Sequence, residues 1–283
     1  MQDSTLIGVV VPTVADVFFG QIMQGILETT RETGYTIVLC THDNAPEKEE
    51  QALRTLRRQR IKGLLITPAA GYVENEDNSY LRASLRALDV PTVLIDRAVK
   101  MPAWDGVYYD NYNGAYLAVE HIIRKGYTDI GCMVSDLALQ IGKDRLRGMQ
   151  QAIADHHISL NCDAIYQDAS AVYVEKSYEM SKCWTERGCL AKAMFFSNGS
   201  LAKGFIKACL EKGLRLGEDV YCVGFDYVDI LEMLPLKYAF LDRDAINMGR
   251  IATKMLMDHF GQTIATRREY IIPASIITTS GDA

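Results

Sequence analysis

Short apolar runs alternate with longer segments of helical period along most of this chain, and this rhythm limits the fold more than any other feature. Most of the runs are apolar on both faces, which is typical of strands buried inside a parallel sheet. The pattern indicates an α/β architecture built from βα units. It predicts eight strands, over 6–11, 37–40, 63–67, 92–96, 106–109, 130–134, 193–197 and 220–225.

The segments between these runs predict eight helices, over 19–33, 46–59, 80–87, 113–125, 145–156, 175–186, 201–212 and 248–260. Several of them end at a glycine that can adopt the left-handed conformation, and a new strand follows each stop. Eight or more βα units exceed one open sheet of usual size, and a chain of 283 residues is near the limit of a single core. We therefore expect two doubly wound lobes with two parallel sheets, joined by short strand crossings.

Charge and apolar content exclude several classes of protein. The formal net charge of -6 gives no global attraction to nucleic acid or to anionic headgroups. No apolar run approaches the roughly 18 residues that span a bilayer, and the start of the chain lacks the pattern of a signal peptide. The seven cysteines form no C-x-x-C pair and lie mostly in apolar segments. A cytoplasmic protein with reduced, buried cysteines and no membrane partner is expected.

A search for catalytic and metal motifs finds none of the nucleotide-binding, zinc-protease or hydrolase signatures. The five histidines are scattered and are expected in surface or packing roles, and the His156–His157 pair has no partner at metal-ligand spacing. We therefore predict no enzyme activity, no catalytic residue, no metal and no cofactor. A basic cluster from Arg54 to Lys62 shares its helix with glutamates, which favours a solvated, salt-bridged face over a phosphate-binding patch.

The informative residues follow the ends of the predicted strands, where ligands bind in such folds. Planar hydrogen-bonding groups in such a set suit a neutral polyhydroxylated ligand, because each hydroxyl both donates and accepts. An aromatic face would cover the apolar side of a sugar ring. Any one of the polar residues could instead cap a helix. Either phenylalanine could instead form a hydrophobic staple at the start of the helix that follows. The set comprises Asp16, Phe18, Phe19, Asp96–Arg97, Asp110–Asn111, Asn198 and Asp226, together with Arg145 just inside a predicted helix.

Six segments, in the correct order, resemble the effector-binding core of the LacI/GalR transcriptional regulators, which has the type I periplasmic-binding-protein fold. The opening strand with Phe18–Phe19 is similar to that family's first strand and its Asn-Pro-Phe-Phe turn. The other five segments are Lys62–Ile66 with Val90–Arg97, Asp110–Ala115 with the helix and Gly126–Tyr127 after it, Asp144–Gly148, Asp219–Asp226, and Arg243 with Met248–Ala252.

The resemblance implies roles for particular residues. Arg145 matches the family arginine that pairs with effector oxygens, Asn198 matches the Asn of an Asn-Asp turn, and Asp226 matches the first Asp of Gly-Phe-Asp-Asp. Asp16, Phe18, Phe19 and Asp96 are expected on the first lobe, and Tyr173 is expected as a substitute for the family's stacking aromatic. Three departures, Val17, Gly199 and Tyr227, leave the effector's identity open.

The implied architecture has two Rossmann-like lobes joined by three crossings. We expect an N-terminal lobe of residues 4–125 plus 241–268 and a C-terminal lobe of residues 126–240 plus 269–283. The implied function is sensing of a small effector, expected to be a carbohydrate, by a homodimer whose lobe closure alters operator DNA binding. The DNA would be contacted by a helix-turn-helix headpiece absent from this chain. The alternatives are a stand-alone periplasmic-type sugar receptor of a transporter and an enzyme on a flavodoxin-like scaffold.

Overall fold

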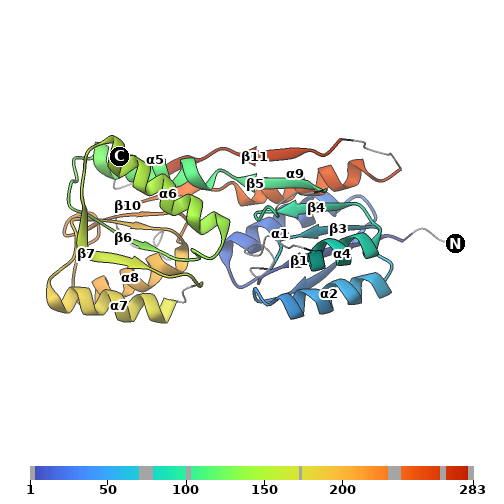
Figure 1. The fold of residues 1–283 in the computed structure, drawn as a ribbon, viewed down its shortest axis with the longest axis horizontal. Helices are drawn as coiled ribbons and strands as arrows, with labels where there is room; N and C mark the ends of the chain where they lie inside the picture. Colours follow the sequence, from blue (N-terminus) through green and yellow to red (C-terminus); the bar gives the residue numbers. More distant parts are fainter. Residues whose placement is uncertain are drawn as a thin grey trace. The chain divides into compact units, whose positions relative to one another are not determined.

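The chain folds into two compact α/β units in the computed structural model, which describes residues 4–69, 79–99, 103–171, 174–228, 237–261 and 266–279 (Figure 1). Unit 1 comprises Met1–Tyr109 and Asp244–Ile272, and unit 2 comprises Asp110–Arg243 and Pro273–Ala283. The chain therefore passes from one unit to the other three times, as the sequence predicts.

Unit 1 contains a six-stranded sheet in the order β11-β5-β4-β3-β1-β2, and all of its pairings are parallel. Its central strands are fully buried, which explains why they read as continuous apolar runs. The strands are β1 (Leu6–Val11), β2 (Thr36–Thr41), β3 (Gly63–Ile66), β4 (Thr92–Ile95), β5 (Asp105–Tyr109) and β11 (Glu269–Ile272).

Unit 2 repeats this plan with the order β12-β10-β9-β8-β6-β7, except that its edge strand β12 runs antiparallel to β10. The repeated order shows that both units follow the same winding rule. The strands are β6 (Ile130–Val134), β7 (Leu160–Gln167), β8 (Ala193–Phe196), β9 (Tyr221–Gly224), β10 (Tyr238–Asp242) and β12 (Ser275–Thr278).

Helices occur at all eight predicted positions. In unit 1 they are α1 (Val17–Thr30), α2 (Pro46–Arg58), α4 (Ser79–Leu88) and α9 (Ala245–Asp258). In unit 2 they are α5 (Asn111–Arg124), α6 (Gln140–Asp155), α7 (Val174–Arg187) and α8 (Gly199–Glu211). The predicted glycine stops are confirmed, because the glycines that follow four of these helices, Gly34, Gly126, Gly188 and Gly213, all have positive φ.

Each sheet is covered on both faces. In unit 1, α2 and α4 enclose one apolar core on the sheet, whereas α1 packs against α9 and α9 contacts β3, β4 and β5 (Figure 1). The α1–α9 contact depends on two glycines: a Cβ added at Gly25 would lie 1.9 Å from the Ile246 carbonyl oxygen, and one at Gly249 would lie 2.2 Å from the Ile22 carbonyl oxygen. In unit 2, α7 and α8 enclose the equivalent core, and α5 packs against α6.

The predicted lobe boundaries need three corrections, the smallest of which is that residues 241–243 belong to unit 2, because β10 extends to Asp242. The sequence analysis ended the first N-terminal segment at residue 125, but α5 packs on α6 and therefore belongs to unit 2. It also assigned residues 269–283 to the C-terminal lobe, but β11 pairs with β5 in the sheet of unit 1. Four strands, β7, β10, β11 and β12, were not predicted. Of these, β7, β11 and β12 carry many exposed residues, so they lack an uninterrupted apolar run.

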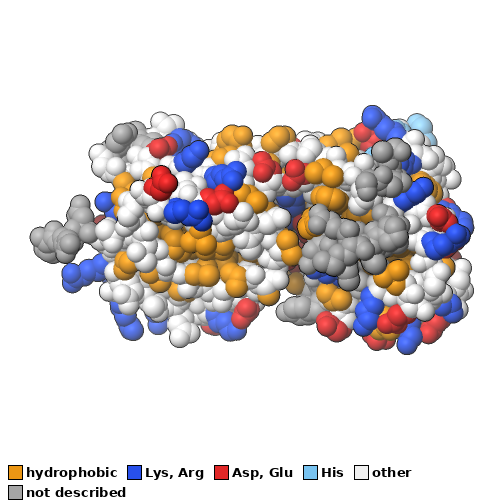
Figure 2. Space-filling view, turned by 180° about the vertical axis from the view of Figure 1, so that it is seen from behind, with side chains coloured by type: hydrophobic (Ala, Val, Ile, Leu, Met, Phe, Trp, Pro, Cys, Tyr) orange, Lys and Arg blue, Asp and Glu red, His pale blue; other side chains and the backbone are white. Residues whose placement is uncertain are grey.

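The expected burial of the cysteines is confirmed for Cys132, Cys209 and Cys222, whereas Cys162 is exposed and the other three are half-buried. All seven cysteines are free thiols, and burial raises the pKa of Cys132 and of Cys209 to about 12. On the face shown in Figure 2, basic and acidic side chains are interspersed rather than gathered into one patch. Within the basic cluster, Arg54 pairs with Glu50 and Lys62 lies over the rings of Tyr35 and Phe260. Among the described helices, none has the length and apolar character needed to cross a bilayer.

Candidate functional site

Both sheets have a topological switch point, which is where α/β sheets of this kind bind ligands. In unit 1 the switch lies between β1 and β3, and in unit 2 it lies between β6 and β8, because successive connections leave these neighbouring strands in opposite directions. Most of the predicted site residues follow the carboxyl ends of strands at or beside these points. Each unit therefore carries its own cluster of polar side chains.

Arg145 is the most enclosed of the predicted residues in unit 2. It lies on the buried face of α6 and is 4% exposed, and its guanidinium donates to two oxygens. Its Nε donates to Asn111 Oδ1 at 2.8 Å, and its Nη1 donates to the Ser197 carbonyl oxygen at 2.7 Å. The guanidinium carbon also lies 3.8 Å from the centre of the Phe225 ring. Arg145 is thus fixed in plane and position by three different segments.

Asn198 joins the two strand ends at the switch point of unit 2. Its Oδ1 caps α8 by accepting from the Leu201 amide at 3.0 Å, so the predicted capping role is confirmed. Its Nδ2 is directed elsewhere, donating to Ser135 Oγ at 2.7 Å beyond the end of β6. The Ser135 amide in turn donates to Ser197 Oγ at 3.0 Å. The side chain of Asn198 therefore makes a hydrogen bond in addition to the one that caps α8.

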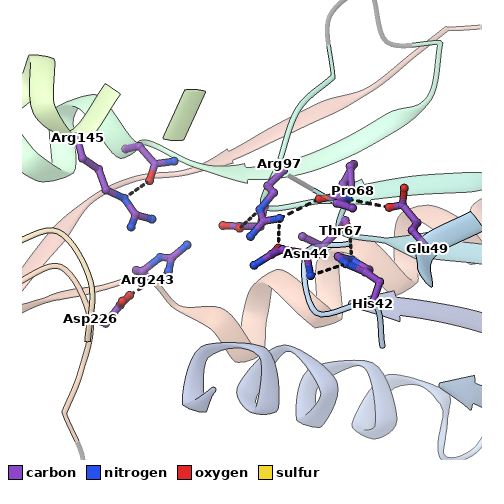
Figure 3. Close-up of polar contacts among 12 residues, drawn as sticks. His42, Asn44, Glu49, Thr67, Pro68, Arg97, Arg145, Asp226 and Arg243 are labelled. Atoms are coloured by element: carbon purple, nitrogen blue, oxygen red, sulfur yellow. Dashed lines mark hydrogen bonds and ion pairs between the residues drawn. The ribbon is translucent and has the colours of Figure 1, made fainter. Parts of the chain in front are cut away.

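Asp226 follows β9 and is tied to both neighbouring strand ends. It accepts from the Gly199 amide at 2.9 Å, and it pairs with Arg243 Nη1 at 3.0 Å (Figure 3). Arg243 is 7% exposed, and its guanidinium carbon lies 5.6 Å from the centre of the Phe225 ring. The Phe225 ring is therefore shared by two buried guanidinium groups, those of Arg145 and Arg243.

Arg145, Asn198 and Asp226 consequently belong to one connected set of contacts at the carboxyl end of the unit 2 sheet. These three residues and Asn111 belong to the set predicted from the sequence, whereas Arg243, Phe225 and Ser135 were not predicted as site residues. For Arg243, the missing signal was the strand before it, since β10 was not predicted.

Replacing Asp226 with asparagine should destabilise unit 2 by roughly 1–3 kcal/mol, because the buried Arg243 guanidinium loses a charged partner while the shape of the side chain is kept. The midpoint of urea unfolding measures this cost. Asp219→Asn is the matched control, since Asp219 pairs with Arg215 at the surface of the same unit, and it should change the midpoint less. Equal midpoints for the two variants would contradict the buried-pair interpretation.

In unit 1, the first predicted group follows β1. Asp16 is exposed and caps α1, with its Oδ1 accepting from the Phe18 amide at 2.9 Å. Phe18 and Phe19 are 8% and 7% exposed, and their ring centres lie 5.2 Å apart in an edge-on arrangement. The capping role of Asp16 is confirmed. Contact of Asp16, Phe18 and Phe19 with an effector stays a prediction.

Asp96 follows β4 and is buried, as is Arg97 after it. Asp96 has a φ of 66°, which is rare for a residue with a side chain, and it closes a tight turn in which the Arg97 amide donates to the Ile95 carbonyl oxygen at 2.7 Å. Strained turns of this kind persist where surrounding contacts fix them, and they cluster at binding sites.

Tyr173 lies outside the described residues. Nearby, the loop after β7 is closed by Asp168, which accepts from Tyr166 and Lys176 at 2.7 and 2.5 Å. The hydrogen bond from Lys176 is the main reason that the pKa of Asp168 falls to about 2. Across the described parts of the chain, no group of three or more His, Cys, Asp or Glu residues is placed to hold a metal ion.

The two-unit architecture and its paired switch points define a protein of the periplasmic-binding-protein class. A family model described as periplasmic binding proteins and sugar binding domain of LacI family matches residues 4–279. The chain therefore belongs to this family.

The relatives are repressors. The chain is 25% identical over 278 residues to the HTH-type transcriptional repressor PurR of Aliivibrio salmonicida, covering 96% of this chain and 80% of the repressor. Among solved structures, a putative ribose operon repressor from Burkholderia thailandensis is 25% identical, with a TM-score of 0.81 over 97% of this chain and 99% of that chain. A LacI family regulator from Enterococcus faecium with bound ribose has a TM-score of 0.82 at 22% identity, covering 96% of each chain.

Proposed function

We propose that this chain is the effector-sensing part of a LacI-type transcriptional regulator and that it binds a sugar or a related polyhydroxylated molecule. One observation supports this most strongly: Arg145, Asn198 and Asp226 are held in one connected set at the switch point of unit 2. Planar amide, carboxylate and guanidinium groups fixed in this way are suited to hydroxyl recognition, since each can address two atoms of a ligand.

The predicted residues of unit 1, Asp16, Phe18, Phe19 and Asp96, contribute to effector binding in this proposal. The protein acts as a binding protein and not as an enzyme, and the matched repressors support a regulator rather than a transporter's receptor. It works in the cytoplasm as a homodimer, with operator DNA contacted by a headpiece outside this chain.

Effector and operator would then be linked reciprocally, with a coupling of typically ~1–3 kcal/mol between the two binding events. Through this linkage, binding of the effector to the chain changes the regulator's affinity for operator DNA.

A thermal-shift screen over D-ribose, other pentoses, hexoses, disaccharides and nucleosides tests the proposal. A true effector at 100 times its dissociation constant should stabilise the fold by roughly 2.7 kcal/mol, because it binds the folded state alone. Calorimetry on any compound that raises the melting temperature gives its affinity. Failure of every compound to stabilise the protein, or chemical turnover of one that does, would count against an effector-sensing role.

A further inference from the structure

Arg97 is held by a closed ring of hydrogen bonds that joins three strand ends of unit 1, which we call the Arg97 clamp (Figure 3). Arg97 Nη1 donates to Asn44 Oδ1 at 2.6 Å and to the Pro68 carbonyl oxygen at 3.0 Å. The backbone N–H of Asn44 donates to His42 Nδ1 at 3.1 Å, and His42 Nε2 lies 2.9 Å from the Thr67 carbonyl oxygen. The clamp thus consists of His42, Asn44, Thr67, Pro68 and Arg97.

The ring fixes the protonation of His42. Since Nδ1 accepts a hydrogen bond, Nε2 carries the proton and donates to the carbonyl of Thr67. Complete burial favours this neutral form and lowers the pKa of His42 to about 4. The sequence analysis expected a surface or packing role for His42, and the structure corrects this: the imidazole bridges the ends of β2 and β3.

A buried carboxyl group abuts the clamp. Glu49, in the first turn of α2, is fully buried, and its Oε1 accepts from the Ala69 amide at 2.8 Å. The N–H of Ala69 and the carbonyl of Pro68 belong to the same peptide group, so this one peptide bridges Glu49 and Arg97. A carboxylate on its N–H side polarises the peptide and strengthens the carbonyl as an acceptor for the guanidinium. Glu49 Oε2 is buried and makes no hydrogen bond.

The surroundings of Glu49 set its titration. Burial raises the pKa of Glu49 to about 7, whereas the Ala69 amide and the charge of Arg97 oppose that rise. Arg97 faces it from the end of β4, and His42 lies in the same clamp at the end of β2. The α4 helix packs against α2 with the apolar side chains of Leu81 and Leu85. The pKa of Glu49 therefore lies in the neutral range, whereas the pKa of His42 lies well below it.

We propose that Glu49 is a proton-sensitive positioning residue: its charge, transmitted through the Pro68–Ala69 peptide, controls how firmly the Arg97 clamp holds the strained Asp96–Arg97 turn. The ionised carboxylate tightens the clamp, and the neutral acid loosens it. This inference rests on the proposed function to the extent that Asp96 contributes to effector binding. The coupling itself is a property of the protein without effector.

Nuclear magnetic resonance on the effector-free protein tests the coupling directly. The Ala69 amide and the Arg97 Nε–H signals should shift together between pH 5.5 and 8.5, with a common midpoint near pH 7. Glu49→Gln should abolish both shifts. Glu50→Gln, the neighbouring carboxylate that pairs with Arg54 at the surface, should leave them intact. An Arg97 signal that stays flat in the wild-type protein, or that still titrates in Glu49→Gln, would overturn the proposal.

Calorimetry with D-ribose at pH 6 and pH 8 adds the functional outcome. Binding should be tighter at pH 8 in the wild-type protein and in Glu50→Gln, and independent of pH in Glu49→Gln. If D-ribose binds at neither pH, it is not the effector. The resonance titration needs no effector, so it would still test the role of Glu49. The wild-type protein could bind D-ribose equally well at the two pH values even though the Ala69 and Arg97 signals titrate as expected. That result would show that Glu49 acts on the clamp alone, and it would refute an effect of Glu49 on effector binding.

Discussion

Arg145→Ala should lower effector affinity by at least about a hundredfold, or roughly 3 kcal/mol, the largest loss we expect from any single substitution in the site. The guanidinium is buried, is aligned by Asn111 and Ser197, and stacks on Phe225. Its removal would take away charge-assisted donors that water cannot replace in an enclosed position. Calorimetry with the compound found in the thermal-shift screen measures the loss.

Two further variants separate binding from folding. Arg145→Lys keeps the charge but not the planar fork, and it should recover little of the affinity. Arg147→Ala removes an exposed arginine from the same helix, one that pairs with Asp144 and lies over Tyr112, and affinity should be unchanged. If Arg145→Ala binds the effector as tightly as Arg147→Ala does, the assignment of the site is wrong.

Gly25→Ala should destabilise unit 1 by roughly 3 kcal/mol, because the new methyl group would collide with backbone rather than with a flexible side chain. Its Cβ would lie 1.9 Å from the Ile246 carbonyl oxygen and 3.0 Å from the Arg250 amide nitrogen, so α1 and α9 would have to separate. The urea midpoint of the variant measures this change.

Gly20→Ala is the control in the same helix. The atom nearest to its added Cβ is the Val14 carbonyl oxygen at 3.9 Å, so the methyl group meets no obstacle. Alanine has the higher helix propensity, and this variant should be neutral or slightly more stable. Similar losses in both variants would show that helix propensity, and not the close α1–α9 approach, governs the response.

Much of the candidate site could be predicted because each residue's position relative to a strand is a local property. Asn198 and Asp226 lie where an apolar run followed by a polar residue placed them, Arg145 lies on a predicted helix, and all three join one connected set in unit 2. The capping alternative was also right for Asp16 and Asn198. A capping residue can nevertheless serve a second purpose, as the amide nitrogen of Asn198 does.

Other parts of the site could not be predicted, since they depend on pairings between distant segments. The Arg97 clamp brings together residues that follow β2, β3 and β4. The spacing of residues in the sequence does not predict that His42 forms a hydrogen bond with Thr67, or that Arg97 forms one with Asn44. The stacking of two arginines on Phe225 depends in the same way on the packing of α6 and on the end of β10.

The α/β class, the eight helices, eight of the twelve described strands and the glycine stops could be predicted from the chain alone, because burial on both faces and helix termination are evident within a few neighbouring residues. Three features became evident only in the folded protein: β11 joins the sheet of unit 1, α5 belongs to unit 2, and Glu49 lies buried beside the Arg97 clamp. Edge strands have an exposed side and so lack a continuous apolar run. The environment of a buried carboxyl group is made by elements that meet only when the chain folds.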